Sequence, residues 1–286
     1  LILLAVDTYP GGLTVPKDHP DITIRGEDRN GVVFDGGDQG SDGITIAADG
    51  VAIENLTLHA FPRNGVVWHG VDGFAARYLT VWNVGGYGLF AFGSRNGQVE
   101  RSLVSGAADA AFYIGECHPC DTFLRFNTAT LSGIGYSGTN AGGGLIFHDS
   151  VFDRNGTGIL PNSFDDEANP PQRDAVFSNN VVSDSGAVPT PASDPIDGLI
   201  GIGIGIAGGH HDTVVGNEVI GSDRYGRRGP LLLGSAVFVA ASVLTALAPT
   251  ITVLVAARLL QGASAAAGRR CSTPSRHSTS TRHGPR

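Results

Sequence analysis

The sequence contains no methionine, not even at position 1, and has only three cysteines and two tryptophans in 286 residues. We expect a chain that starts at Leu1 to be a processed protein or a fragment. Its opening run, LILLAV, is too short for the apolar core of a secretory signal and lacks a basic flank. A structural zinc site needs four ligands, and the sequence has no second CxxC pair to complete one.

Helical periodicity is absent from the first 222 residues, and so is the Leu-x-x-Leu-x-Leu frame of leucine-rich repeats. Short runs rich in β-branched and aromatic residues recur instead, bounded by turn residues as strands are. One series begins at positions 53, 76, 99, 124, 147, 177 and 215, and a second at 65, 88, 111, 135, 158 and 203. Two or three strands in about 23 residues predict coils that stack to bury a shared apolar core. Two proline-rich excursions, at 160–172 and 185–195, are expected to be loops.

Charge divides the chain into two parts. Residues 1–222 contain 10 Lys or Arg against 26 Asp or Glu, a balance of −16, whereas residues 223–286 contain nine Arg and the single acid Asp223, a balance of +8. Such asymmetry marks different environments or different origins. We therefore expect a repeat domain at 1–222, a hydrophobic helical segment at 223–267 and a disordered tail at 268–286.

The repeat resembles right-handed parallel β-helix proteins of the pectin-lyase-like class over roughly residues 20–222, including the stretch FYIGECHPC. This resemblance implies an all-β solenoid. It leaves the chemistry open, because the class includes lyases, hydrolases, epimerases and binders without catalytic activity.

Alternation along the second series assigns its side chains to two faces. Apolar columns that begin at Val66 and Trp68 are expected to face the core, and they run as far as Ile204 and Ile206. The outward columns then contain His69, Phe90, Phe92, Tyr113 and Asn162. Contiguous exposed aromatic side chains favour a ligand surface, and sugar rings stack on such surfaces. The alternative is that a flanking loop or a missing N-terminal segment covers these rings.

Carboxylates near this face are candidates for chemistry. Glu116 lies at a strand end, and Asp165, Asp166 and Glu167 lie in the first excursion. Glu116, Asp165 and Asp166 are the candidate catalytic acids, and Asp165, Asp166 and Glu167 could bind Ca²⁺ through oxygen ligands. The alternative is a solvated acidic loop, and no other cofactor or metal is expected. A lyase would need a basic proton acceptor, and the charge of −16 repels acidic polysaccharides.

Cys117 and Cys120 lie in the turn ECHPCD, without the βαβ frame of a redox CxxC motif. A local disulfide is the simplest interpretation in an extracytoplasmic protein, with free thiols as the alternative. A second column also has a structural interpretation. Asn55, Asp149, Asn179 and Asn217 predict a partial ladder of stacked amides, interrupted at positions 78, 101 and 126.

Residues 231–257 carry no charge and are interrupted by Pro249, which suits one membrane span or a short helical hairpin. The segment 221–267 resembles major facilitator superfamily transporters, through GSDRYGRRG followed by AARLLQGASAA. Such transporters need about twelve helices around a central site, so this fragment is not expected to transport on its own. We interpret the chain as a chimera of a β-helix gene and a transporter fragment, with a genuine C-terminal membrane anchor at 231–267 as the alternative.

The expected function is that of an extracytoplasmic β-helix protein that binds or modifies carbohydrate through its aromatic face. If it is an enzyme, the resemblance implies a polysaccharide lyase, hydrolase or epimerase. The expected partner is a polysaccharide and not a nucleic acid. The competing hypothesis is a structural or adhesive β-helix without an active site.

Overall fold

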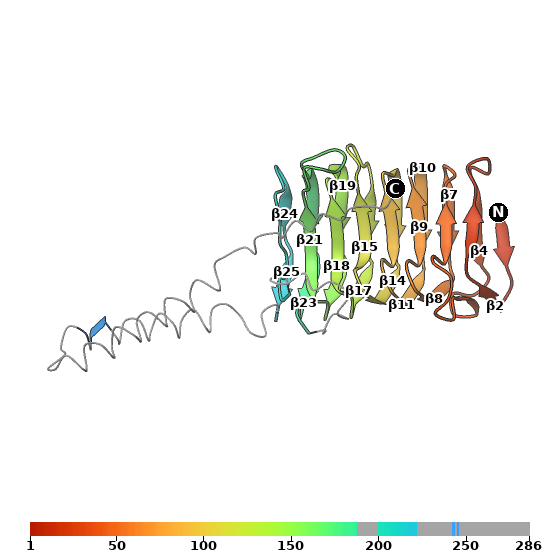
Figure 1. The fold of residues 1–286 in the computed structure, drawn as a ribbon, viewed down its shortest axis with the longest axis horizontal. Coiled ribbons are helices and arrows are strands. Elements are labelled where there is room, and N and C mark those ends of the chain that lie inside the picture. The colour runs from red at the N-terminus through yellow and green to blue at the C-terminus, as the bar shows by residue number, and fades with distance from the viewer. Residues whose placement is uncertain (188–199, 222–241, 244, 246–286) are drawn as a thin grey trace, which may run out of the picture. The chain divides into compact units, whose positions relative to one another are not determined.

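Short runs of alternating residues, separated by glycine and by left-handed turn residues, form strands that pair between successive coils. The computed structural model describes residues 1–187, 200–221, 242–243 and 245. Its described residues contain 25 strands in three parallel sheets. Figure 1 shows these strands stacked side by side from β1 to β24 and β25.

Sheet A contains the first strand of each coil. Its members are β1 (Ile2–Leu4), β4 (Thr23–Gly26), β7 (Val51–Glu54), β10 (Asp72–Arg77), β13 (Arg95–Glu100), β16 (Phe123–Arg125), β19 (Gly142–His148), β22 (Arg173–Ser178) and β24 (Thr213–Val215).

Sheet B contains the second strand of each coil, and sheet C the third. Sheet B consists of β2 (Asp7–Pro10), β5 (Val32–Asp35), β8 (Thr57–Phe61), β11 (Thr80–Val84), β14 (Leu103–Ala107), β17 (Thr128–Thr130), β20 (Val151–Asp153), β23 (Val181–Ser183) and β25 (Glu218–Ile220). Sheet C consists of β3 (Leu13–Val15), β6 (Ile44–Ile46), β9 (Val66–His69), β12 (Leu89–Phe92), β15 (Ala110–Gly115), β18 (Ile134–Thr139) and β21 (Thr157–Asn162). The described part is therefore the parallel β-solenoid that the repeat predicts.

The inward columns of sheet C are those predicted from alternation. Leu89 pairs with Val66 on one side and Phe112 on the other, in an unbroken parallel register. The inward side chains at these positions are almost fully buried: Val66, Leu89, Phe112, Tyr136, Ile159, Trp68, Ala91 and Ile114. Stacked coils thus share one continuous core, as a repeat that cannot bury its own apolar side requires.

Ile206 does not follow the predicted column. It is 38% exposed rather than in the core. Beyond β21 the pairing with the next coil is reduced to isolated bridges, such as Ile159 with Ile204. The two bridges Ile159 with Ile204 and Asn162 with Ala207 keep one register, but among the described strands sheet C has none beyond this segment that could cover Ile206.

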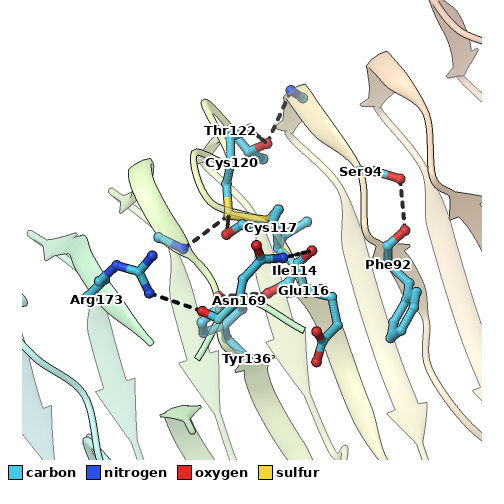
Figure 2. Close-up of a disulfide and its surroundings, with 12 residues drawn as sticks. Phe92, Ser94, Ile114, Glu116, Cys117, Cys120, Thr122, Tyr136, Asn169 and Arg173 are labelled. Atoms are coloured by element: carbon cyan, nitrogen blue, oxygen red, sulfur yellow. Dashed lines mark hydrogen bonds between the residues drawn. A yellow bond between two sulfur atoms is a disulfide. The ribbon is translucent and has the colours of Figure 1, made fainter. Parts of the chain in front are cut away.

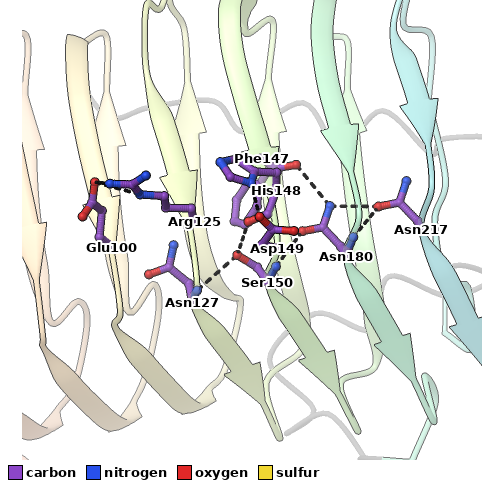
Figure 3. Close-up of polar contacts among 9 residues, drawn as sticks. All are labelled: Glu100, Arg125, Asn127, Phe147, His148, Asp149, Ser150, Asn180 and Asn217. Carbon is purple, nitrogen blue, oxygen red and sulfur yellow. Dashed lines mark hydrogen bonds and ion pairs between the residues drawn. The ribbon is translucent and has the colours of Figure 1, made fainter.

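The turn between sheets A and B carries the polar ladder, one residue later than the predicted column. Asn55, Asp149 and Asn179 all have positive φ and form the bend itself. The stacked side chains are instead those of the following residues, which lie inside the turn: Ser102, Asn127, Ser150, Asn180 and Asn217. The predicted ladder is therefore wrong in register, and only Asn217 of that column belongs to it (Figure 3).

The inner ladder satisfies backbone groups of neighbouring coils. The Ser150 N–H donates to Asn180 Oδ1 at 3.0 Å, and the Asn180 N–H donates to Asn217 Oδ1 at 2.9 Å. Two of the asparagine side chains also donate to carbonyls of the preceding coil. Asn180 Nδ2 donates to the Phe147 carbonyl at 3.1 Å, and Asn127 Nδ2 donates to the Val99 carbonyl at 2.8 Å. The Asn180 amide therefore links its coil to both neighbours, and the Asn127 amide links its coil to the preceding one, so that these buried polar groups have hydrogen-bond partners.

The predicted helical hairpin and disordered tail lie outside the described residues, apart from residues 242, 243 and 245. In the part of the chain that the structure describes, no helix is both long and apolar enough to span a membrane.

Candidate functional site

The outer face of sheet C brings together the outward residues predicted from the sequence. Phe90 pairs with Val67 and Tyr113, and Phe92 pairs with His69 and Gly115. His69 is exposed, and Phe90 and Phe92 are half-buried. Tyr113 is only 5% exposed, so this ring is covered, as the alternative interpretation required.

The rings form a continuous stack across the strands, which we call the aromatic face: His69, Tyr87, Phe90, Phe92 and Tyr113. His69 stacks on Phe92 with ring centroids 5.4 Å apart, and Phe92 stacks on Phe90 at 5.9 Å. Phe90 in turn lies 4.8 Å from Tyr113. Ring pairs at these separations attract one another beyond the area they bury, so the face is ordered before any ligand arrives.

Tyr87 and Asp109 border the aromatic face on the side of the turn between sheets B and C. The Tyr87 ring stacks on Phe90 at 4.6 Å and lies tilted against Tyr113 at 5.1 Å. Burial raises the pKa of the Asp109 carboxyl, and the Tyr87 hydroxyl that donates to it opposes this shift. Burial together with Asp109 also raises the pKa of the Tyr87 hydroxyl. This border therefore presents the Tyr87 ring, whose hydroxyl donates to the Asp109 carboxyl.

The loop of residues 163–172 borders the opposite side. It follows β21 and is fixed by Asn169, whose Nδ2 donates to the Glu116 carbonyl at 3.0 Å, and by Arg173, whose Nη1 donates to the Asn169 carbonyl at 3.0 Å (Figure 2). The Asn140 Nδ2 donates to the Phe164 carbonyl at 2.8 Å and anchors the start of the loop. The loop therefore lies against the end of β15.

Glu116 lies under this loop, in a left-handed backbone conformation with φ of 58°. Its side chain is 5% exposed, and among the described residues neither carboxyl oxygen has a hydrogen-bond partner of good geometry. Burial, and then the neighbouring Glu167 carboxylate, raise the pKa of Glu116 to about 7, against a smaller opposing effect of the Ala168 N–H. Burial also raises the pKa of Tyr113 to about 12, and Glu116 and Glu167 add to that shift.

The structure brings Glu167 to Glu116 but leaves the other predicted acids in solvent. Asp165 and Asp166 are exposed on the same loop. Among the described residues, no group of three or more His, Cys, Asp or Glu side chains has an arrangement that could hold a metal ion. The Ca²⁺ hypothesis at Asp165, Asp166 and Glu167 therefore has no geometric support here.

Asn162 is the last of the predicted outward residues along sheet C and lies at the end of β21. The Thr139 hydroxyl donates to Asn162 Oδ1 at 2.8 Å, and Asn162 Nδ2 lies 3.4 Å from the Ser137 hydroxyl. Asn162 is therefore engaged by the neighbouring strand, with its side chain half-buried.

A disulfide joins Cys117 and Cys120 in the turn after Glu116, with an S–S distance of 2.13 Å (Figure 2). Both residues are buried, and the Gly142 N–H points at the Cys120 sulfur at 3.1 Å. The bridge closes the turn that directly follows Glu116 and so restrains the backbone next to this residue.

The family described as "Right handed beta helix region" matches residues 64–228, which is more than half of the chain. The chain belongs to this right-handed β-helix family. A second family, "Sugar (and other) transporter", matches residues 213–274. No curated protein matches the chain. The β-helix sequence is thus followed by a transporter-like segment, as the resemblances at the two ends of the chain predicted.

Sequence reasoning missed two residues of this β-helix site, Tyr87 and Asp109. Both lie in turns, outside the strand columns on which the prediction rested. The signal for Tyr87 was an aromatic residue inside the glycine run GGYG, where a solvated turn has no need of one.

Proposed function

We propose that this β-helix protein binds a polysaccharide against the outer face of sheet C. The supporting observation is the unbroken ring stack from His69 through Phe92 to Phe90, which remains partly open to solvent. Phe90 at the inner end of this stack packs against Tyr113. A preordered aromatic surface lowers the entropic cost of binding a flat sugar ring. The family contributes only the β-helix scaffold, on which carbohydrate-related and structural roles both occur.

Binding is favoured over catalysis by the environment of the best acid. A general acid must reach the atom that it protonates, whereas Glu116 is nearly fully buried under the loop of residues 163–172. The buried disulfide supports an extracytoplasmic location for the domain, because such bridges persist in oxidising compartments.

Replacing Phe92 with alanine in the full chain is expected to weaken polysaccharide binding by about 1–2 kcal/mol, because the ring is a half-exposed anchor. The same substitution at Phe90 is expected to act similarly. Affinity is measured by calorimetry with whichever polysaccharide a glycan panel selects. The thermal midpoint of the Phe92→Ala variant is expected to change little, because the ring lies outside the core.

Phe126→Ala is the matched control. Phe126 is 44% exposed, lies on the turn between sheets A and B, and contacts Arg101 rather than the aromatic face. Its loss is expected to leave polysaccharide binding unchanged. If Phe92→Ala lowered stability sharply while no glycan bound the parent chain, the aromatic face would be a structural packing surface and the adhesive or structural role would replace the proposal.

A further inference from the structure

A second aromatic surface lies on a different sheet from the aromatic face. The chain has two tryptophans. Trp68 is 1% exposed in the core, whereas Trp82 is 42% exposed on strand β11 of sheet B. Tryptophan has an amphipathic ring that is enriched at interfaces, so an exposed indole is a candidate contact for a ligand.

His59 covers the indole from one side. His59 on β8 stacks on Trp82 with ring centroids 4.2 Å apart and planes 16° apart. His59 Nδ1 in turn lies 3.5 Å from Asp35 Oδ1 on β5. These three residues share one outward column of sheet B, so the stack is built into the register of the strands.

The other side of the indole faces small side chains. Ser105 on β14 pairs with Trp82, and Thr130 on β17 pairs with Ser105. The column reaches a large polar side chain again at Asp153 on β20. Neighbouring strands lie about 4.8 Å apart, so the half-buried Ser105 is the residue next to the indole on this side, whereas the Thr130 hydroxyl oxygen one strand further is buried.

The surroundings of this strip define the ligand. An aromatic ring with one uncovered side suits the C–H face of a pyranose ring, whose own hydroxyl groups then lie on the side of Ser105. Asp35 lies beyond His59 in this column, and residues 1–222 as a whole have a charge balance of −16, so a sugar that carries a carboxylate is disfavoured. We propose that Trp82 is the platform of a second saccharide-binding surface, for an uncharged pyranose chain. This surface is independent of the polysaccharide site proposed on sheet C.

Intrinsic fluorescence tests this proposal directly, because Trp82 is the only exposed tryptophan. Cellohexaose, a chain of uncharged pyranose rings, is titrated into the full chain while tryptophan emission and its quenching by acrylamide are recorded. We expect a saturable change in emission and protection from acrylamide. Hexagalacturonate, its acidic counterpart, is expected to produce at least about tenfold weaker saturation.

Three variants separate the sources of the signal. Trp82→Ala is expected to abolish the emission change and to weaken cellohexaose binding at least about tenfold, while emission from Trp68 reports that the core is intact. Phe92→Ala, on the other sheet, is expected to leave the Trp82 signal unchanged. His59→Ala is expected to weaken binding without abolishing it, because His59 supports the Trp82 ring only on the side that faces away from the ligand.

Emission and quenching that stay constant up to the solubility limit of cellohexaose would overturn the proposal, and so would a change that persists in Trp82→Ala. Both outcomes are distinguishable from failure at sheet C. If the proposal for sheet C were wrong, glycan binding would be insensitive to Phe92→Ala, and the fluorescence titration of Trp82 would be unaffected.

Discussion

Replacing Asn180 with alanine is expected to lower the free energy of unfolding by about 2–4 kcal/mol. Asn180 is fully buried, accepts from the Ser150 N–H and donates to the Phe147 carbonyl and to Asn217. Alanine would leave the Ser150 N–H and the Phe147 carbonyl buried without their side-chain partner. Because unmade hydrogen bonds in a dry interior cost more than made ones contribute, the loss should be large. Urea unfolding followed by circular dichroism measures it.

Asn179→Gly is the control that separates the two candidate ladder positions. Asn179 is exposed and has a φ of 53°, a conformation that glycine adopts without strain. Its replacement is expected to change the free energy of unfolding by no more than about 0.5 kcal/mol. The opposite ranking, with Asn179→Gly the more damaging variant, would restore the column predicted from the sequence and contradict the ladder seen in the structure.

The ladder shows which level of the fold can be read from the sequence. The repeat spacing placed asparagine or aspartate in the turn after several of the first strands, because turn chemistry recurs with the coil. Asn179 and Asn180 are adjacent, and residue identity does not tell which of them bends the backbone and which points inward. The structure assigns positive φ to Asn179 and the inward position to Asn180. By contrast, alternation inside a strand has a fixed period of two, and the core columns of sheet C could therefore be predicted.

The candidate site was predictable only where it lies on strands. His69, Phe90 and Phe92 follow from the outward columns, and they lie together. The pairing of Glu116 with Glu167 does not follow, because it depends on how a loop 51 positions later in the chain folds back. Loop paths of this length have no period, so the covering of Tyr113 could be stated only as an alternative.

The stability of the β-helix is expected to fall by about 1–3 kcal/mol as the pH rises from about 5 to about 8. Burial and Glu167 raise the pKa of Glu116 from 4.5 to about 7. Between these values the folded state binds more protons than the unfolded state, so the stabilisation is complete below the lower value and is lost as the pH passes the upper one. Asp109, whose pKa burial also raises, contributes in the same direction.

Groups with lowered pKa values act at more acidic pH and do not mask this effect. Burial opposes the shift at Glu54, but the hydrogen bonds and charges of Arg77 and Arg25 outweigh it and lower the pKa of that carboxyl. The stability from this pair of ion pairs is present above the unfolded pKa of Glu54. It is lost only as the pH falls through the lower folded value, outside the window set by Glu116.

Three variants test whether the pH dependence originates at the covered carboxyl. Glu116→Gln removes the titrating group and is expected to flatten most of the fall, leaving the part that Asp109 supplies. Glu167→Gln removes the neighbouring charge, so the pKa of Glu116 should decrease and the fall should move to lower pH. Asp165→Asn changes an exposed acid on the same loop and is expected to leave the profile unchanged. Urea unfolding of each full-length variant across the pH range provides the comparison. An undiminished fall in Glu116→Gln would place the titrating group elsewhere.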